Sequence, residues 1–119
     1  MEKVTGIGGG VFRARDPEGL AAWYAAHLGL APGAGGAPWH QQAGFTVFAP
    51  FPDGTDYFPA DRAFMLNLRV ADLDAMLAQL AAAGIDADTR ADRDGPHGRF
   101  ARIHDPEGNP VELWQPPAP

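Results

Sequence analysis

Two stretches of the chain repeat apolar residues at the spacing of an amphipathic helix. The first follows Asp16 and Pro17, an N-cap residue and a proline suited to the first helical turn, and ends at Gly29. The second begins at Asp72 and ends at Gly84. The apolar positions are Leu20, Trp23, Tyr24 and Leu28 in the first stretch, and Leu73, Met76, Leu77 and Leu80 in the second. The pattern predicts two helices that each pack one face against a core.

Strand-like segments flank both predicted helices in the same order. Residues 6–15 precede the first helix and residues 64–71 precede the second. Asp16 and Leu20 correspond to Asp72 and Met76 when the two halves are laid over one another. Further strands are expected at 38–42 and 45–51 in the first half, and at 85–93, 98–104 and 110–115 in the second. This repetition indicates a duplicated α+β unit.

The predicted strands carry different residues on their two faces. Between residues 64 and 70 every even position is apolar, whereas the odd positions are Met65, Asn67 and Arg69. In the last two strands a similarly mixed face contains Phe100, Arg102, Glu112 and Trp114. Such a face is typical of a concave ligand pocket, and an oligomer interface or a core with an internal Arg–Glu pair would also produce it.

Arg102 and Glu112 fall on the same face of two adjacent predicted strands, so we expect a cross-strand contact. A carboxylate inside a partly apolar pocket needs a cation nearby. Arg102 is the first candidate for that cation and Arg69 is the second. We therefore expect an Arg102–Glu112 pair to form the polar anchor of the pocket.

Composition sets outer limits on the function. The chain has 119 residues, a hydrophobic fraction of 45% and a net charge of −6, which together indicate one globular domain and argue against nucleic-acid binding. An acidic chain also suits a cationic ligand. The N-terminal residues lack the apolar core of a signal peptide, and no stretch approaches the ~20 apolar residues of a membrane span. We therefore expect a cytoplasmic protein without a membrane partner.

The residues available for catalysis are few. The chain has no cysteine and no serine, and its three threonines lie in no nucleophile motif. Of the four histidines, His27 is expected at a helix-packing edge and His97 in a loop over the second half. His40 is interpreted equally well as a pocket residue or a surface strand residue, and His104 is expected near the pocket rim. No two of them have the spacing of a known metal site.

Three motifs together resemble one superfamily. They are RDPEGLAAWYAAHLGL at 15–30, RVADLDAMLAQLAAAGI at 69–85, and RFARIH followed by DPEGNPVELW at 99–114. In this order they resemble the vicinal oxygen chelate superfamily, which contains glyoxalases, extradiol dioxygenases and bleomycin-resistance proteins. The resemblance implies an α+β fold of two βαβββ modules, at about 1–60 and 61–119, that form a half-open, eight-stranded, barrel-like sheet around a pocket. It also implies a homodimer.

The resemblance bears on metal binding as well. The metal-dependent members take one ligand from the terminal hairpin, which maps onto Glu112, and others from the first strand of each module. Those first-strand positions are Gly9 and Met65 here, and neither residue is a ligand for a hard divalent cation. We therefore expect no cofactor, with a divalent metal bound through Glu112 as the alternative.

The leading functional prediction is a small-molecule-binding protein that needs no metal. Its pocket is predicted to contain Trp39, His40, Met65, Asn67, Phe100, Arg102, Glu112 and Trp114. One alternative is a glyoxalase-like lyase or isomerase, or a dioxygenase, with Glu112 as the candidate catalytic residue and a metal shared with His40 or His104. A second alternative is a structural or regulatory dimer with a vestigial pocket.

Overall fold

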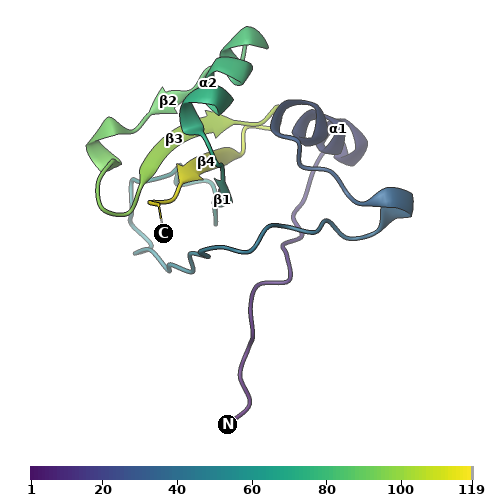
Figure 1. Ribbon diagram of the computed structural model, residues 1–119, viewed down its shortest axis with the longest axis horizontal. Coiled ribbons are helices and arrows are strands. Elements are labelled where there is room, and N and C mark those ends of the chain that lie inside the picture. The colour runs from purple at the N-terminus through teal and green to yellow at the C-terminus, as the bar shows by residue number, and fades with distance from the viewer. Residues whose placement is uncertain (119) are drawn as a thin grey trace.

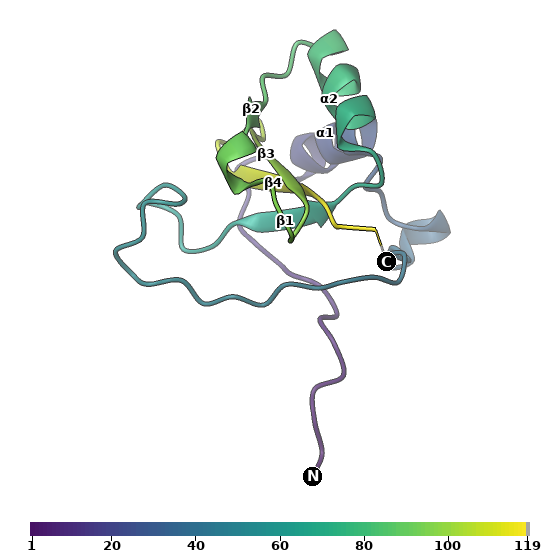
Figure 2. The ribbon, with the colours of Figure 1, turned by 60° about the vertical axis from the view of Figure 1, so that its left-hand side comes forward.

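The computed structural model describes residues 1–118 and shows a four-stranded sheet with two helices on one of its faces (Figures 1 and 2). Across the sheet lie β1 (Leu66–Arg69), β4 (Pro110–Gln115), β3 (Arg99–His104) and β2 (Asp88–Thr89), in that order. β1 pairs with β4 in parallel, and the other neighbouring strands are antiparallel. The second half of the chain therefore forms a β-α-β-β-β unit, as the sequence predicts.

Both helices form where the apolar spacing places them. They are α1 (Pro17–Leu28) and α2 (Leu73–Ala82). The side chains of Asp16 and Asp72 accept hydrogen bonds from backbone N–H groups three residues further on, at 3.1 and 3.0 Å. Gly29 ends α1 with a φ of 67°, which glycine adopts without strain. No helix within residues 1–118 has both the length and the apolar character to cross a membrane.

The hydrophobic core lies between the sheet and the two helices. Its strand side is made of Ala101, Ile103, Val111 and Leu113, all with no exposed surface. Its helix side is made of Leu20, Tyr24, Leu73 and Leu80, all at most 6% exposed. The three apolar residues of 66–70 pack against this core as the alternation predicts, but Phe64 is 54% exposed because it precedes the paired part of β1.

The turn between β3 and β4 holds the beginning of α1. The carboxylate of Glu107 accepts hydrogen bonds from the backbone N–H groups of Arg15 at 2.6 Å and Asp16 at 2.9 Å. These N–H groups precede the helix, and an acceptor with negative charge is favourable at that end. Through this contact the terminal hairpin positions α1, the only α-helix of the first half within residues 1–118.

The strands expected in the first half are not formed within the single chain. Residues 6–15, 38–42 and 45–51 have no ladder partners, and the N-terminal segment extends away from the sheet (Figure 2). Two of their apolar side chains, Val11 and Phe48, are 99% and 85% exposed. A strand exists only where a neighbouring edge accepts its backbone hydrogen bonds, and sequence alternation does not supply that edge. Within residues 1–118 the sheet therefore contains four strands, where the sequence predicts eight.

Candidate ligand-binding site

A row of polar side chains crosses the sheet on the face opposite the helices. Asn67 of β1 lies beside Glu112 of β4, and Glu112 lies beside Arg102 of β3. The neighbouring core residues point to the helices, so strand alternation directs this row to the other face. The mixed face predicted from the sequence is therefore present, and it belongs to a single continuous sheet.

Both oxygens of the Glu112 carboxylate have donors within the protein. The Asn67 side-chain amide donates to Oε1 at 2.8 Å, and the Tyr57 hydroxyl donates to Oε2. Glu112 is only 7% exposed, so these two hydrogen bonds replace most of its water. Tyr57 comes from the loop that precedes β1, and its ring packs on Phe51 with centroids 5.4 Å apart.

Arg102 is buried beside this carboxylate without an ion pair to it. Its Nη2 donates to the backbone carbonyl of Tyr57 at 2.8 Å, its Nε has no hydrogen-bond partner, and the residue is 8% exposed. Within residues 1–118 no carboxylate oxygen lies within 4.0 Å of its guanidinium. The expected Arg102–Glu112 ion pair is therefore wrong. Tyr57 contacts both groups instead, one through its hydroxyl and the other through its carbonyl.

Three guanidinium groups surround the Tyr57 ring. The guanidinium carbons of Arg93, Arg102 and Arg90 lie 3.9, 5.2 and 5.6 Å from the ring centroid. Cations at such distances from an aromatic face are attracted by its negative quadrupole. Tyr57 thus joins a loop of the first half to three arginines of the second half.

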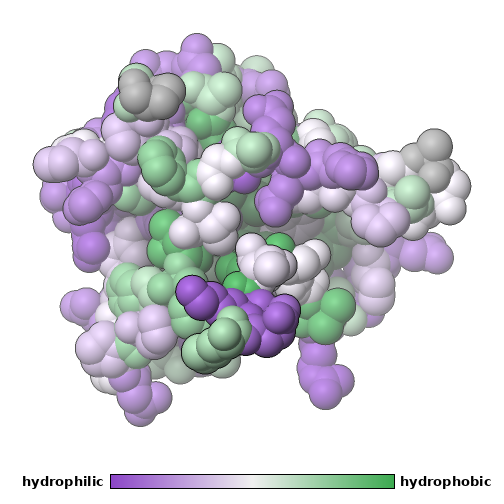
Figure 3. Space-filling view, turned by 60° about the horizontal axis from the view of Figure 1, so that its bottom comes forward, coloured by the Kyte–Doolittle hydropathy of each residue, from purple (hydrophilic) through white to green (hydrophobic). Residues whose placement is uncertain are grey.

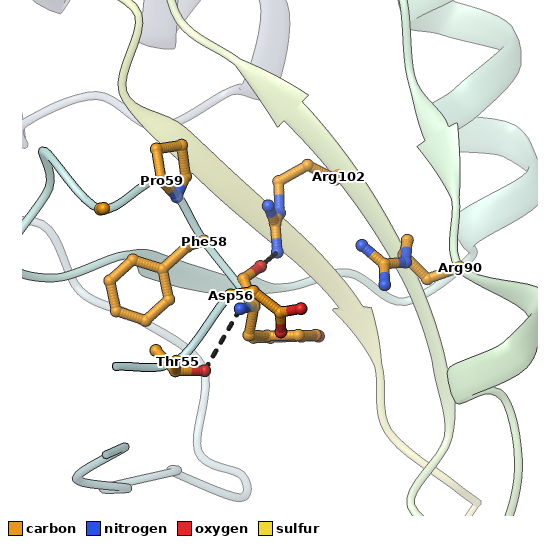
Figure 4. Close-up of a pocket in the computed structure, with 8 residues that line it drawn as sticks. Thr55, Asp56, Phe58, Pro59, Arg90 and Arg102 are labelled. Carbon is orange, nitrogen blue, oxygen red and sulfur yellow. Dashed lines mark hydrogen bonds between the residues drawn. The ribbon is translucent and has the colours of Figure 1, made fainter. Parts of the chain in front are cut away.

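The loop containing Tyr57 forms one wall of a hollow of about 440 Å³. Residues 55–60 form this wall, and Arg90 and Arg102 form the facing side. Figure 4 shows the two arginine side chains directed from the sheet toward the loop, with Phe58 and Pro59 on the loop side. The volume is in the range of small-molecule sites, and the lining combines apolar groups with a few charged ones.

Phe100 and Trp114 occupy the next row of the same face. They are cross-strand partners, and their rings are parallel with centroids 6.3 Å apart. The Trp114 Nε1 donates to the His97 carbonyl at 2.7 Å, which ties the loop of residues 94–98 to the sheet. His97 therefore contributes a backbone group here, and its side chain is exposed.

The structure brings together some of the predicted pocket residues and separates others. Asn67, Arg102 and Glu112 form the polar row, and Phe100 and Trp114 lie beside it. Met65 is half-buried just before β1, whereas Trp39 is 49% exposed and His40 is exposed on a segment without strand pairing. Within residues 1–118 neither Trp39 nor His40 has a side-chain hydrogen bond that links it to the polar row.

Sequence reasoning gave no specific role to two central residues, Tyr57 and Arg90. The segment 51–58 is interpreted from its sequence as either a pocket wall or a turn-rich connection, and the structure supports the first interpretation. Its concentration of aromatic residues was the available signal. Arg90 follows the short strand β2 and its N–H donates to the Phe100 carbonyl at 3.1 Å, which continues the ladder and places it on the pocket face.

The residues of this face do not fit a divalent metal centre. No group of three or more His, Asp or Glu side chains that could hold a metal ion occurs within residues 1–118. Both Glu112 oxygens already accept hydrogen bonds from Tyr57 and Asn67. His40 and His104 are exposed and belong to no such group.

The two tyrosines of the chain provide a direct check on these contacts. Burial raises the pKa of Tyr24 and of Tyr57 above the ordinary value of 10.0, and the acceptors Asp105 and Glu112 raise it further. Arg93 and Arg102 offset part of the rise in the pKa of Tyr57. We expect absorbance at 295 nm to show little tyrosinate at pH 10 in the folded protein, and about half ionisation in denaturant. Tyr57→Phe isolates the Tyr24 signal, and half ionisation of the folded wild type at pH 10 would contradict both contacts.

A family model identifies the family of this chain. The model of the Glyoxalase-like domain family matches residues 10–114. TnmS3, an antibiotic-binding protein from Streptomyces sp. CB03234, has a crystal structure similar over 98% of this chain and 100% of its own, with 26% identity and a TM-score of 0.62. A glyoxalase/bleomycin resistance protein from the same organism is 29% identical over 84% of this chain and 91% of its own, with a TM-score of 0.49. No curated protein matches the chain. The chain therefore belongs to the Glyoxalase-like domain family of the vicinal oxygen chelate superfamily, as its three motifs predict.

Proposed function

We propose that this protein binds a small organic molecule in the hollow beside Tyr57 and Arg102, and that it does so without a metal. The observation that carries the proposal is the state of Glu112, whose two carboxylate oxygens accept from Tyr57 and Asn67. A carboxylate that already has two protein donors serves to position side chains around a pocket. The similarity to TnmS3, an antibiotic-binding protein, supports an antibiotic or a comparable natural product as the ligand.

The test is a thermal-shift and tryptophan-fluorescence screen against a panel of antibiotics, run with and without a chelator. A ligand that binds only the folded protein stabilises it by about 2.7 kcal/mol at one hundred times its Kd. We expect at least one compound to raise the melting temperature equally in both conditions. Tyr57→Ala should weaken that binding, and Ala22→Ser, on an exposed position of α1, is the matched control. Binding that chelation abolishes and added metal restores would instead favour the metal-dependent enzyme.

We further propose that two copies of the chain complete the eight-stranded sheet. Support comes from the exposed apolar residues of the unpaired first-half segments, among them Val4, Val11, Phe45 and Phe48. Figure 3 shows apolar side chains gathered among polar ones on the lower face of the molecule. Monomeric proteins rarely leave such surface uncovered, and β1 presents an edge on which a strand of a second copy can pair.

Light scattering after gel filtration tests this arrangement. The expected mass is twice the 12.6 kDa of one chain. Phe48→Asp places a charge on the exposed apolar segment and should shift the protein toward the monomer. The same kind of charge at Ala22, on the exposed side of α1, should leave the mass unchanged. A wild-type protein that stays monomeric at 100-micromolar concentration would refute the shared sheet.

A further inference from the structure

The hollow contains more positive charge than the acidic composition of the chain suggests. Arg102 is buried, has no carboxylate within 4.0 Å among residues 1–118, and leaves its Nε without a partner. A buried guanidinium has lost most of its hydration, and one carbonyl acceptor does not replace a counter-ion. Arg90 lines the same hollow with a side chain that is 25% exposed.

Within residues 1–118 the neighbouring carboxylates make no close ion pair with Arg102. Glu112 is its cross-strand partner and keeps its negative charge, but the two oxygens of Glu112 accept hydrogen bonds from Tyr57 and Asn67. Asp92 lies 3.6 Å from the Nε of Arg90, but its side chain is 70% exposed, and exposed ion pairs are weak. Asp56 is exposed in the loop wall and has no arginine nitrogen within 4.0 Å among the described residues. The net charge of −6 acts from a distance, and salt screens such charges over about 8 Å at physiological ionic strength.

The opposite wall of the hollow has a different character. Phe58 and Pro59 add an apolar ring and a rigid pyrrolidine to its lining, and Figure 4 shows them on the loop, farther from the two arginines than Asp56. A molecule that satisfies both walls has an acidic group at one end and an apolar, flat body at the other. Guanidinium groups bind carboxylates through paired hydrogen bonds, which suits an acid of this kind.

From this geometry we propose that the ligand is an organic acid whose carboxylate is received by Arg90 and Arg102 while its aromatic body packs on Phe58 and Pro59. This inference rests on the proposed binding function and specifies the class of its ligand. It reverses the expectation, drawn from the acidic composition, that the ligand is a cation. The carboxylate of the ligand would supply the direct ion-pair partner that Arg102 lacks among the described residues.

Three probes of one shape test the charge preference: 2-naphthoate, 2-naphthamide and 2-naphthylmethylammonium. Calorimetric titration of the full chain should show 2-naphthoate binding at least about tenfold more tightly than the amide, because its hydrogen bonds are charge-assisted. Raising the salt concentration should lower the ratio of the acid's affinity to the amide's affinity. An amide or ammonium probe that binds as tightly as the acid overturns the charge inference and leaves the binding function standing. If none of the three probes binds, and no antibiotic of the panel does, both are overturned.

Substitutions test which arginine residues cause the preference for the acid over the amide. Arg90→Gln should reduce the acid-to-amide ratio to near one while the amide affinity is retained. Arg102→Lys keeps a buried charge and should retain part of the ratio, whereas Arg102→Gln should lose it. Arg99→Gln is the control, because Arg99 pairs with Asp74 at 2.9 Å and does not line the hollow. Since Arg102 is buried in the sheet, circular dichroism accompanies each titration, and Arg90→Gln decides the outcome if the Arg102 variants unfold. An unchanged ratio in folded Arg90→Gln overturns the assignment.

Discussion

Replacing Leu113 with alanine is expected to lower the free energy of unfolding by about 3 kcal/mol, within the usual range for a fully buried leucine. Leu113 lies on β4, one of the two central strands of the sheet, and has no exposed surface. Its removal leaves a cavity between the sheet and the helices, because the surrounding side chains relax only in part. Domains of this kind have a total free energy of unfolding of roughly 5–15 kcal/mol, so the expected loss is a large part of it.

Urea denaturation followed by circular dichroism measures this loss. The midpoint should fall while the slope of the transition stays constant, since the surface exposed on unfolding is little changed. Leu77→Ala is the matched control, because Leu77 is only half-buried on α2 and should cost less than half as much. All variants are compared at one protein concentration, because any association between copies adds to the apparent stability. Equal losses at Leu113 and Leu77 would contradict the position of the core.

The elements that the sequence predicts well are those determined by local chemistry. Asp16 and Pro17 define the beginning of α1 through a side-chain cap and a preset φ, and both effects act within one turn. The predicted strand 110–115 coincides with Pro110–Gln115, because the turn before it contains a proline and Gly108 at a φ of 79°. The alternation of apolar and polar residues along β3 and β4 also predicts correctly which face of this hairpin is buried.

The elements that it predicts poorly depend on distant partners. The segments 6–15 and 45–51 alternate or repeat apolar residues as strands do, but pairing requires an edge that no local pattern can supply. The alternation of side chains between the two faces of a strand correctly predicted that Arg102 and Glu112 are neighbours, and the strand register confirms that they are cross-strand partners. The alternation could not show that Tyr57, which is 55 residues away from Glu112 along the chain, donates a hydrogen bond to the Glu112 carboxylate. Tyr57 thus makes the contact that was expected from Arg102. The aromatic composition of this loop indicates a pocket wall, but a loop without periodicity does not indicate which distant side chain its residues contact.

Asp105 is the other residue whose replacement should have a large effect. It is 5% exposed and lies at the start of the turn between β3 and β4. Its carboxylate accepts four hydrogen bonds: from the Tyr24 hydroxyl at 2.8 Å, the Glu107 N–H at 2.9 Å, the Asn109 N–H at 3.0 Å and the Asn109 amide at 2.8 Å. It therefore joins α1 to the terminal hairpin and organises the turn at the same time.

Asp105→Ala is expected to lower the free energy of unfolding by about 3 kcal/mol, because it leaves several partly buried donors without an acceptor. Tyr24→Phe removes one of these hydrogen bonds and should cost about half as much. Lys3→Ala, at an exposed position outside the helices and strands, is the control and should fall within about 0.5 kcal/mol of the wild type. A loss in Asp105→Ala no greater than that of the control would show that the four hydrogen bonds contribute nothing net.

The pKa of the Asp105 carboxylate predicts how the free energy of unfolding depends on pH. Burial alone would raise the pKa of Asp105, but the hydrogen bonds from Asn109, Tyr24 and Glu107 outweigh it and hold the pKa below the ordinary value of 3.8. The folded protein then binds fewer protons than the unfolded chain, so this stabilisation is fully present above the unfolded pKa and is lost as the pH falls through the folded one. Urea midpoints measured between pH 6 and pH 2.5 should fall less steeply in Asp105→Asn than in the wild type. The asparagine variant keeps the shape of the side chain without its titration, so an equally steep fall in both proteins would place the acid sensitivity in other carboxylates.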